Sequence, residues 1–477
     1  MAEIIQNIMK KENYEDKIKD EKIVLKWKVE MEKQGGKKLY IDLAIDLIKK
    51  MKNNHSEINI YDHINWHLNL REGTVIANNI YKQCDCKCKI CVGDECCSDE
   101  YDYEDDDESD NKSDNDNESE NEDDDGNEMT KYSKECKCIG KIIKKKYISK
   151  NCFTNYDIEN KFRIKLMEEI DKFALSKKVD YHPWSNNLVK DIVHPSLYCY
   201  VKGVTEPKIN NNIIFSWLPA ECKVSKKSAS FTSYINNIPK NNDTKNLYHI
   251  IEKLLYSFIP NFQKVVDRLC NSTKLIDSNL QVIVKIAEIN LTPSNTKYHG
   301  GTWHLEGITD ENIVATGIYY YNMDNVTQSN LKFRTCVDEE IVYPQNCVQF
   351  VKTHYDMDDY EYDENERRGG IIIDSTMKLA QIKTKQGLSL VFPNNLQHCV
   401  SSFELKDKTK EGKRSIIAFF LIDPNKKILS TKDVTEQYDK ISLKDAKIFR
   451  EMLMFERKNE ILFHNSVYKV GWSLCEH

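Results

Sequence analysis

Apolar residues follow two different periods along this chain. Four segments alternate between apolar and polar residues or are rich in β-branched and aromatic residues, which predicts strands: residues 281–291, 313–321, 387–392 and 414–422. Other segments place apolar residues every three or four positions, which predicts amphipathic helices: residues 23–31, 40–50, 247–255 and about 442–460. The chain is therefore expected to have an α+β fold.

These periods divide the chain into five predicted regions. We expect a helical N-terminal region at 1–83, a Cys-rich and acidic insert at 84–138, a helical support region at 139–278, a strand-rich domain at 279–430 and a C-terminal helical segment at 431–477. A polar stretch at 356–368 is either a lid over a site between the strands or a solvated connection.

Charge is concentrated in the insert. The chain has 477 residues and a formal net charge of -7, yet residues 99–128 hold 18 acidic side chains against Lys112 alone, which leaves the remainder at about +10. Such a run cannot bury apolar surface and is expected to be disordered. It either attracts a basic protein partner, mimics nucleic acid or covers the chain's own basic surface, or it is a solvated insert without function.

The sequence contains 16 cysteines but no apolar N-terminal leader and no run of the roughly 18 apolar residues that a membrane helix needs. Reduced thiols in a cytoplasmic or nuclear protein, away from any membrane, are therefore expected. Cys88-x-x-Cys91 has the spacing of a zinc knuckle, which Cys136-x-Cys138 could complete across the acidic run as a closed structural site. Unligated thiols in biased sequence are an equally good interpretation.

Three further residues carry candidate chemistry. His304 and Glu306 lie two positions apart, so on a strand both side chains point to one face, and His398 follows a later predicted strand. Two imidazoles and one carboxylate form the facial triad that binds non-haem Fe(II) and leaves positions open for a co-substrate and O₂. A His-x-Glu pair also occurs by chance, and most histidines are structural or exposed.

Arg414 opens an otherwise apolar predicted strand. A buried guanidinium needs an anion, and a carboxylate held by its planar fork is the natural partner. In a facial-triad oxygenase this anion is the distal carboxylate of 2-oxoglutarate. The alternative is that Arg414 pairs with Glu404, Asp407 or Glu411 on the preceding loop.

The chain resembles domain-of-unknown-function family 4246, which is related to Fe(II)/2-oxoglutarate oxygenases. The resemblance lies in several ordered segments: 180–183, 191–198, 217–221, 233–237, 301–307, 313–321, 392–398 and the strand from Arg414. It implies a double-stranded β-helix, or jelly-roll, core at 279–430. Many related oxygenases carry a hydroxyl two residues after the arginine, but Ile416 stands there in this chain. A second co-substrate anchor is therefore expected from Tyr319, Tyr321 or Thr302.

The expected function is that of an Fe(II)- and 2-oxoglutarate-dependent oxygenase with hydroxylase or demethylase chemistry. Its ligands would be His304, Glu306 and His398, with no catalytic residue beyond them. The alternatives are an inactive β-helix that acts as a binding scaffold, and a cupin-type metalloprotein that uses no 2-oxoglutarate. The substrate is open, and nucleic acid is not specifically indicated.

Overall fold

The computed structural model describes residues 2–57, 154–157, 160–207, 213–269, 273–336, 372–373, 376–468 and 472–473. The acidic run, the stretch at 356–368 and the possible zinc ligands Cys88, Cys91, Cys136 and Cys138 lie outside these ranges. The chain divides into two units. The described part of the second unit includes a short antiparallel pair of β11 (Ile372–Ile373) and β17 (Trp472–Ser473).

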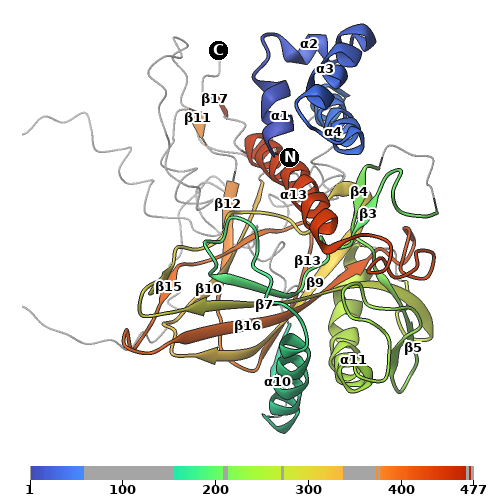
Figure 1. The fold of residues 1–477 in the computed structure, drawn as a ribbon. Helices are drawn as coiled ribbons and strands as arrows, with labels where there is room; N and C mark the ends of the chain where they lie inside the picture. Colours follow the sequence, from blue (N-terminus) through green and yellow to red (C-terminus); the bar gives the residue numbers. More distant parts are fainter. Residues whose placement is uncertain are drawn as a thin grey trace, which may run out of the picture. The chain divides into compact units, whose positions relative to one another are not determined.

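The first unit is built around an eight-stranded antiparallel sheet, called here the main sheet (Figure 1). Its order is β1 (Thr154–Asp157), β13 (Leu388–Pro393), β9 (Ile313–Asp324), β16 (Gly412–Ile422), β7 (Ser278–Leu291), β5 (Ala220–Val224) and β6 (Ala229–Phe231), with β2 (Val189–Val193) also paired to β7. Each of the four strands predicted from the sequence is present in it.

One face of the main sheet is covered by the amphipathic helix α11 (Lys245–Leu269), beside α10 (Asn160–Leu175) (Figure 1). The ring of Phe258 on α11 lies 5.5 Å from that of Phe419 on β16. A Cβ atom on Gly317 would lie 2.6 Å from Phe258 Cδ1, so this glycine permits the close approach of helix and sheet. Residues of β9 and β16 in phase with Gly317 and Phe419 belong to this packed face.

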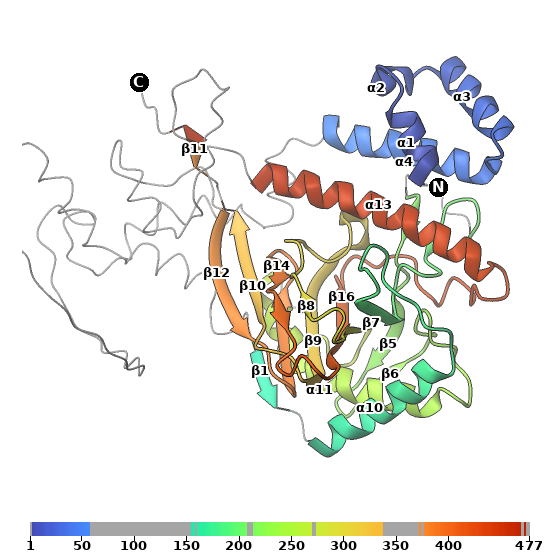
Figure 2. The ribbon, with the colours of Figure 1, turned by 60° about the vertical axis from the view of Figure 1, so that its left-hand side comes forward.

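The opposite face of the main sheet, here the interior face, looks toward a second antiparallel sheet (Figure 2). This sheet has the order β12 (Thr376–Lys383), β10 (Asn330–Cys336), β14 (Gln397–Val400). Phe392 on β13 lies across from Phe333 on β10, with ring centroids 4.9 Å apart. The contact places aromatic side chains of both sheets in one shared interior.

The described part of the first unit also contains two shorter pairs of strands. They join β8 (Lys297–Tyr298) to β15 (Phe403–Glu404), and β3 (Tyr200–Val201) to β4 (Phe215–Ser216).

The region 139–278, predicted to be a helical support, contains strands β1 to β6 as well as α10 and α11. These strands have two to five residues, too short to show a period, and three of them pair at the β7 side of the main sheet.

The described part of the N-terminal region, residues 2–57, is helical. It contains α1 (Ala2–Met9), α2 (Tyr14–Lys17), α3 (Glu21–Lys33) and α4 (Lys38–Glu57). On α3 the buried residues Val24, Trp27 and Met31 recur every three or four positions, which is one face of a helix. Near the C-terminus, α13 (Leu443–Tyr468) begins one residue after the predicted start at Ser442. In the described part of the chain, no helix combines the length and apolarity that crossing a membrane requires.

Candidate metal centre

The backbone brings His304 and His398 directly opposite each other. The two residues form an antiparallel bridge, in which each amide donates to the carbonyl of the other at 3.2 and 3.0 Å. Residues paired in this way project their side chains to the same face. Their imidazole centroids lie 4.5 Å apart, and His398 contacts the interior ring of Phe392 at 4.9 Å. Both imidazoles therefore lie at the shared interior.

Glu306 joins them from two positions beyond His304. Its Oε1 atom lies 3.7 Å from His304 Nε2 and 3.5 Å from His398 Nε2. Asn394 fixes the backbone here, because its side chain accepts from the Glu306 amide at 2.9 Å and donates to the Glu306 carbonyl at 2.8 Å. Gly307 follows at φ +76°, where a Cβ would lie 2.5 Å from Ile313 Cδ1. The sequence before and after Glu306 thus holds the carboxylate in place.

The hydrogen bonds of the two rings decide which nitrogens are available. His304 Nδ1 lies 2.8 Å from the Thr302 carbonyl oxygen, and His398 Nδ1 lies 3.4 Å from that of Leu396. A carbonyl accepts only, so each Nδ1 carries a hydrogen, and Nε2 is the nitrogen whose lone pair a metal would take in place of a proton. Both Nε2 atoms face Glu306. Metal-binding histidines characteristically donate their second ring nitrogen in this way.

Glu306, His304 and His398 shift one another's pKa values. Burial opposes ionisation of Glu306, but hydrogen bonds from both imidazoles and the charge of His304 outweigh it and hold its pKa well below the usual range. Burial also works against a charged His304, yet the neighbouring Glu306 raises the pKa of that ring. Burial and the positive charge of His304 lower the pKa of His398. The result is an anionic carboxylate beside two imidazoles, which is a donor set for a divalent cation.

Arg414 lies on the interior face with its side chain almost fully buried. Its guanidinium lies 5.0 Å from the ring centroid of Tyr320 and 5.8 Å from that of Phe403. In the part of the chain that the structure describes, Arg414 Nε has no hydrogen-bond partner and the guanidinium has no ion pair. Of the alternative loop partners, Glu404 pairs with Lys408 and Asp407 with Lys410.

The predicted co-substrate anchors lie in different places. Tyr319 and Tyr321 point to the face of β9 that packs under α11, so they are separated from Arg414 by the sheet. The tyrosine that shares the interior face with Arg414 is Tyr320. Thr302 is exposed, and it reaches the candidate centre through its carbonyl oxygen, which orients His304. Side chains alternate along β9, so Tyr319 and Tyr321 share one face and Tyr320 has the other. The sequence does not tell which of these faces lies in the interior.

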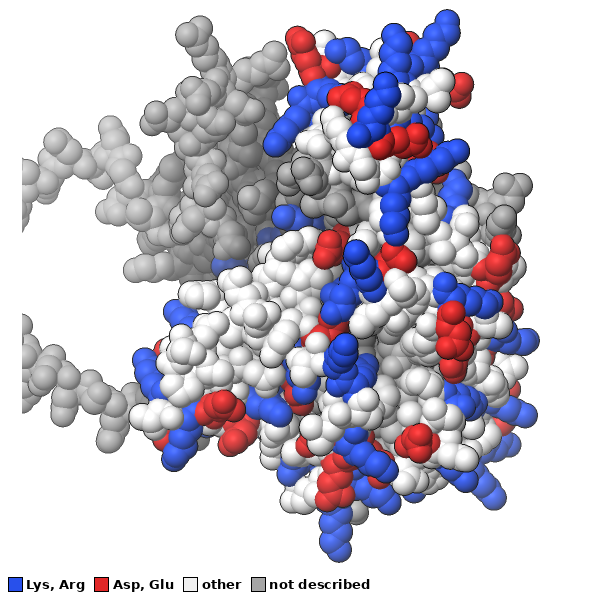
Figure 3. Space-filling model, in the orientation of Figure 1, with Lys and Arg blue, Asp and Glu red and all other residues white. Residues whose placement is uncertain are grey.

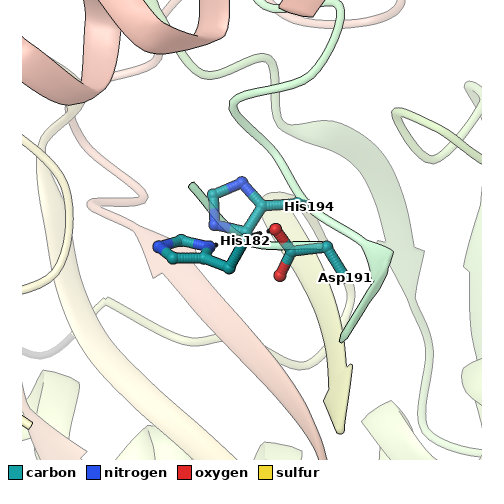
Figure 4. A group of neighbouring side chains, drawn as sticks. All are labelled: His182, Asp191 and His194. Atoms are coloured by element: carbon teal, nitrogen blue, oxygen red, sulfur yellow. Dashed lines mark hydrogen bonds and ion pairs between the residues drawn. The ribbon is translucent and has the colours of Figure 1, made fainter. Parts of the chain in front are cut away.

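A second group of possible ligands, His182, Asp191 and His194, was missed in the sequence. The backbone pairing of Asp180 with Asp191 and of His182 with Val189 brings these side chains together, although they lie nine and three positions apart in the sequence. Figure 4 shows both rings turned toward the Asp191 carboxylate, whose Oδ2 lies 3.0 Å from His182 Nδ1. In both groups, one possible ligand atom from each residue lies within 4.8 Å of those of the other two.

The hydrogen bonds of this second group differ from those of the first. His194 Nδ1 accepts the backbone N–H of Ser196 at 3.2 Å, so the hydrogen of the neutral ring is on Nε2. A protonated Nε2 has no lone pair for a metal. His182 Nδ1 is already bonded to the carboxylate. Ring tautomers therefore favour His304, Glu306 and His398 as the metal centre, and a hydrogen-bonded network for His182, Asp191 and His194.

Comparison with protein families gives a match to the model described as "Protein of unknown function (DUF4246)", over residues 122–276 and 267–444. The chain belongs to the DUF4246 family. Comparison with curated protein sequences gives no match.

Solved structures that resemble this DUF4246 protein include Fe(II)/2-oxoglutarate dioxygenases and prolyl hydroxylases. A structure titled IDO from Bacillus thuringiensis is 9% identical, with a TM-score of 0.29, and the match covers 59% of this chain and 94% of that one. A prolyl hydroxylase from Trichoplax adhaerens is 10% identical, with a TM-score of 0.27 and coverage of 63% and 96%. A Pseudomonas putida prolyl-4-hydroxylase is 7% identical, with a TM-score of 0.25 and coverage of 60% and 98%. Likenesses this distant carry no weight for function.

Proposed function

We propose that this DUF4246 protein is an Fe(II)- and 2-oxoglutarate-dependent oxygenase with a double-stranded β-helix core. The strand order supports the core. The central main-sheet strands β7, β16, β9 and β13 face a layer formed by the His304 segment, β14, β10 and β12. Along the chain these eight segments pass between the layers and return, as in a two-sheet jelly roll.

The observation that carries the proposal is the convergence of two Nε2 atoms on one carboxylate oxygen. Two imidazoles and a carboxylate suit Fe(II), which when bound there supplies oxidative chemistry at its open coordination positions. His304, Glu306 and His398 would hold the ion. Phe392 and Phe333 border His398 with apolar rings and keep water away from it.

Arg414 provides the support for 2-oxoglutarate. A buried guanidinium whose Nε is unpartnered in the described residues is costly unless an anion reaches it, and a carboxylate accepts two of its parallel N–H groups. Tyr320 lies against the same guanidinium, and in our proposal it takes the place as second anchor that the sequence assigned to Tyr319 or Tyr321.

Succinate formation tests the proposal. Purified protein loaded with Fe(II) should convert 2-oxoglutarate to succinate in air, slowly even without substrate, and should not do so under nitrogen. The variant Glu306→Ala removes the shared ligand and should abolish conversion. Arg414→Met keeps the apolar packing but loses the fork, so it should weaken 2-oxoglutarate binding by roughly tenfold or more, since a hydrogen bond to a charged group contributes about 1.5–3 kcal/mol.

The same experiment separates the alternatives. If the wild-type protein binds iron but never forms succinate and does not bind 2-oxoglutarate, the cupin-type interpretation holds. If it binds neither, the domain is an inactive scaffold. An Arg414→Met variant that loses iron and 2-oxoglutarate equally would show that this residue supports the fold and not the co-substrate.

A further inference from the structure

A second cation, Lys285, enters the same interior from β7. Lys285 is paired with Ala418 on β16, and Ala418 with Ile318 on β9. Two residues along β16, Phe420 stacks on Trp217 at 5.6 Å, on the face away from α11. Lys285 is in phase with these residues and with Arg414, so its side chain leaves the main sheet on the interior face.

The register also sets Lys285 apart from Arg414. Arg414 is paired with Ile289, four residues further along β7 than Lys285. At about 3.3 Å a residue, the two attachment points lie roughly 13 Å apart. A five-carbon dicarboxylate spans roughly half that distance, with carbon–carbon bonds of about 1.5 Å. A 2-oxoglutarate molecule held by Arg414 therefore leaves Lys285 available.

The register also brings Lys285 near the second histidine group, because Asp191 on β2 is paired with Ala287, two residues along β7 from Lys285. Glu306 faces its two imidazoles, and Asp191 is bonded through Oδ2 to His182, while its Oδ1 has no hydrogen-bond partner in the described residues. Within the described ranges no hydrogen bond or ion pair is formed by the Lys285 ammonium.

The neighbours of Lys285 on the adjacent strands leave its positive charge without a counter-charge. Its partners along the row, Ala418, Ile318 and Leu390, are apolar, so no neighbour in the row neutralises it. The side chain is only partly buried and can be reached by a ligand. An ammonium that is partly desolvated in an apolar wall attracts an anion.

We propose that Lys285 binds an anionic group of the substrate, a carboxylate or a phosphate, in the interior shared with the metal centre. The proposal rests on the proposed oxygenase function and adds a substrate class to it. Arg414 would hold the co-substrate at one end of the interior face, while Lys285 holds the substrate further along β7. A compound whose anionic group is masked as an amide or ester would not be held.

Anion binding at Lys285 can be measured directly. The full-length protein is loaded with Zn(II), saturated with 2-oxoglutarate and reductively methylated with ¹³C on its lysines. The Lys285 resonance is identified by its absence from Lys285→Arg. Acetate, inorganic phosphate and neutral acetamide are then titrated, with exposed Lys223 on the neighbouring strand β5 as the matched reference. We expect a saturable shift of Lys285 with acetate or phosphate, and the better anion identifies the group. The proposal would be overturned by no shift of Lys285, by an equal shift with acetamide, or by a linear response of Lys285 like that of Lys223.

A second measurement separates substrate binding from co-substrate binding. Calorimetry on the Zn(II) protein compares the affinity for 2-oxoglutarate in Arg414→Met and Lys285→Met. The loss from the arginine change should exceed that from the lysine change tenfold or more, and equal losses would assign Lys285 to the co-substrate instead. Succinate formation by the Fe(II) protein reports on the oxygenase function separately. If succinate forms while Lys285 ignores anions, the inference alone fails; if Lys285 binds anions without succinate formation, the oxygenase function alone fails.

Discussion

At the scale of single residues, the direction of a ring nitrogen distinguishes a metal ligand from a hydrogen-bonding histidine. His304 and His398 donate through Nδ1 to carbonyl oxygens, whereas His194 receives an amide there. Two groups with similar composition and spread therefore have opposite capacity for a cation. Composition alone, whether in sequence or in space, does not make this distinction.

The tautomers predict one tightly bound divalent ion for each chain in the described region. Replacing a ligand, as in His398→Ala, should weaken binding by at least roughly 100-fold, the upper end of what loss of a supporting outer partner costs. Asp191→Asn keeps its size and should leave the metal content unchanged. Elemental analysis after anaerobic loading with Fe(II) and desalting measures both. Loss of metal in Asp191→Asn with retention in His398→Ala would reverse our assignment of the two groups.

The candidate centre could be predicted from the sequence only in part. His304, Glu306, His398 and Arg414 were identified because residue type and strand period together restrict what they can do. Tyr320 was passed over for its two neighbours, since both faces of β9 are apolar and its burial pattern has no polar side. Asn394 was seen only as part of a family-like segment, because its role is to hold the Glu306 backbone, which no spacing rule predicts.

At the scale of elements, the C-terminal helix α13 is joined to the segment after Glu306 by a buried ion pair. Arg457 donates to the fully buried carboxylate of Glu311, which also accepts from the amides of Trp217 and Ile308. The Arg457 guanidinium stacks 3.6 Å from the centroid of the Trp217 ring, and that ring stacks on Phe420. A helix remote in sequence thus braces the loop that carries the metal-binding carboxylate.

Breaking this pair should be strongly destabilising. Arg457→Ala leaves Glu311 buried and without its cation, which typically costs about 3–5 kcal/mol. Urea unfolding monitored by tryptophan fluorescence gives the change in the free energy of unfolding. Lys410→Ala is the matched control, because it removes an exposed pair with Asp407 that should contribute less than about 1 kcal/mol. A similar small effect in both variants would mean that α13 is not a brace.

The elements themselves were predictable where they are long. Strands β7, β9, β13 and β16 and helices α3, α4, α11 and α13 carry enough residues for a period to show. The short strands β2, β5 and β6 do not, because strands of three to five residues are stabilised by pairing at the β7 side and not by their own pattern. This is why residues 139–278 were expected to form a helical support region.

At the scale of the whole molecule, the acidic run and the rest of the chain carry opposite charge. On the face in Figure 3, lysines and arginines project from much of the described surface, interspersed with acidic residues. Residues 99–128 carry a net charge of about -17, against about +10 for the remainder. At low ionic strength such charges act over tens of ångströms, roughly 30 Å at 0.01 M salt. We therefore propose that the run governs encounters with other charged molecules, including a basic protein partner.

Deleting residues 99–128 tests this role. The remaining chain is net basic, so its affinity for polyanions should rise, most visibly at low salt, and the gain should shrink as salt screens it. Binding to labelled single-stranded DNA and to heparin, at roughly 0.02 and 0.2 M salt, measures the effect. Fe(II) content and succinate formation should stay near wild type, because the deleted segment lacks the apolar residues to join a core. If deletion instead removes the bound metal or unfolds the protein, the acidic run is an integral part of the fold, and its charge serves the protein's own stability.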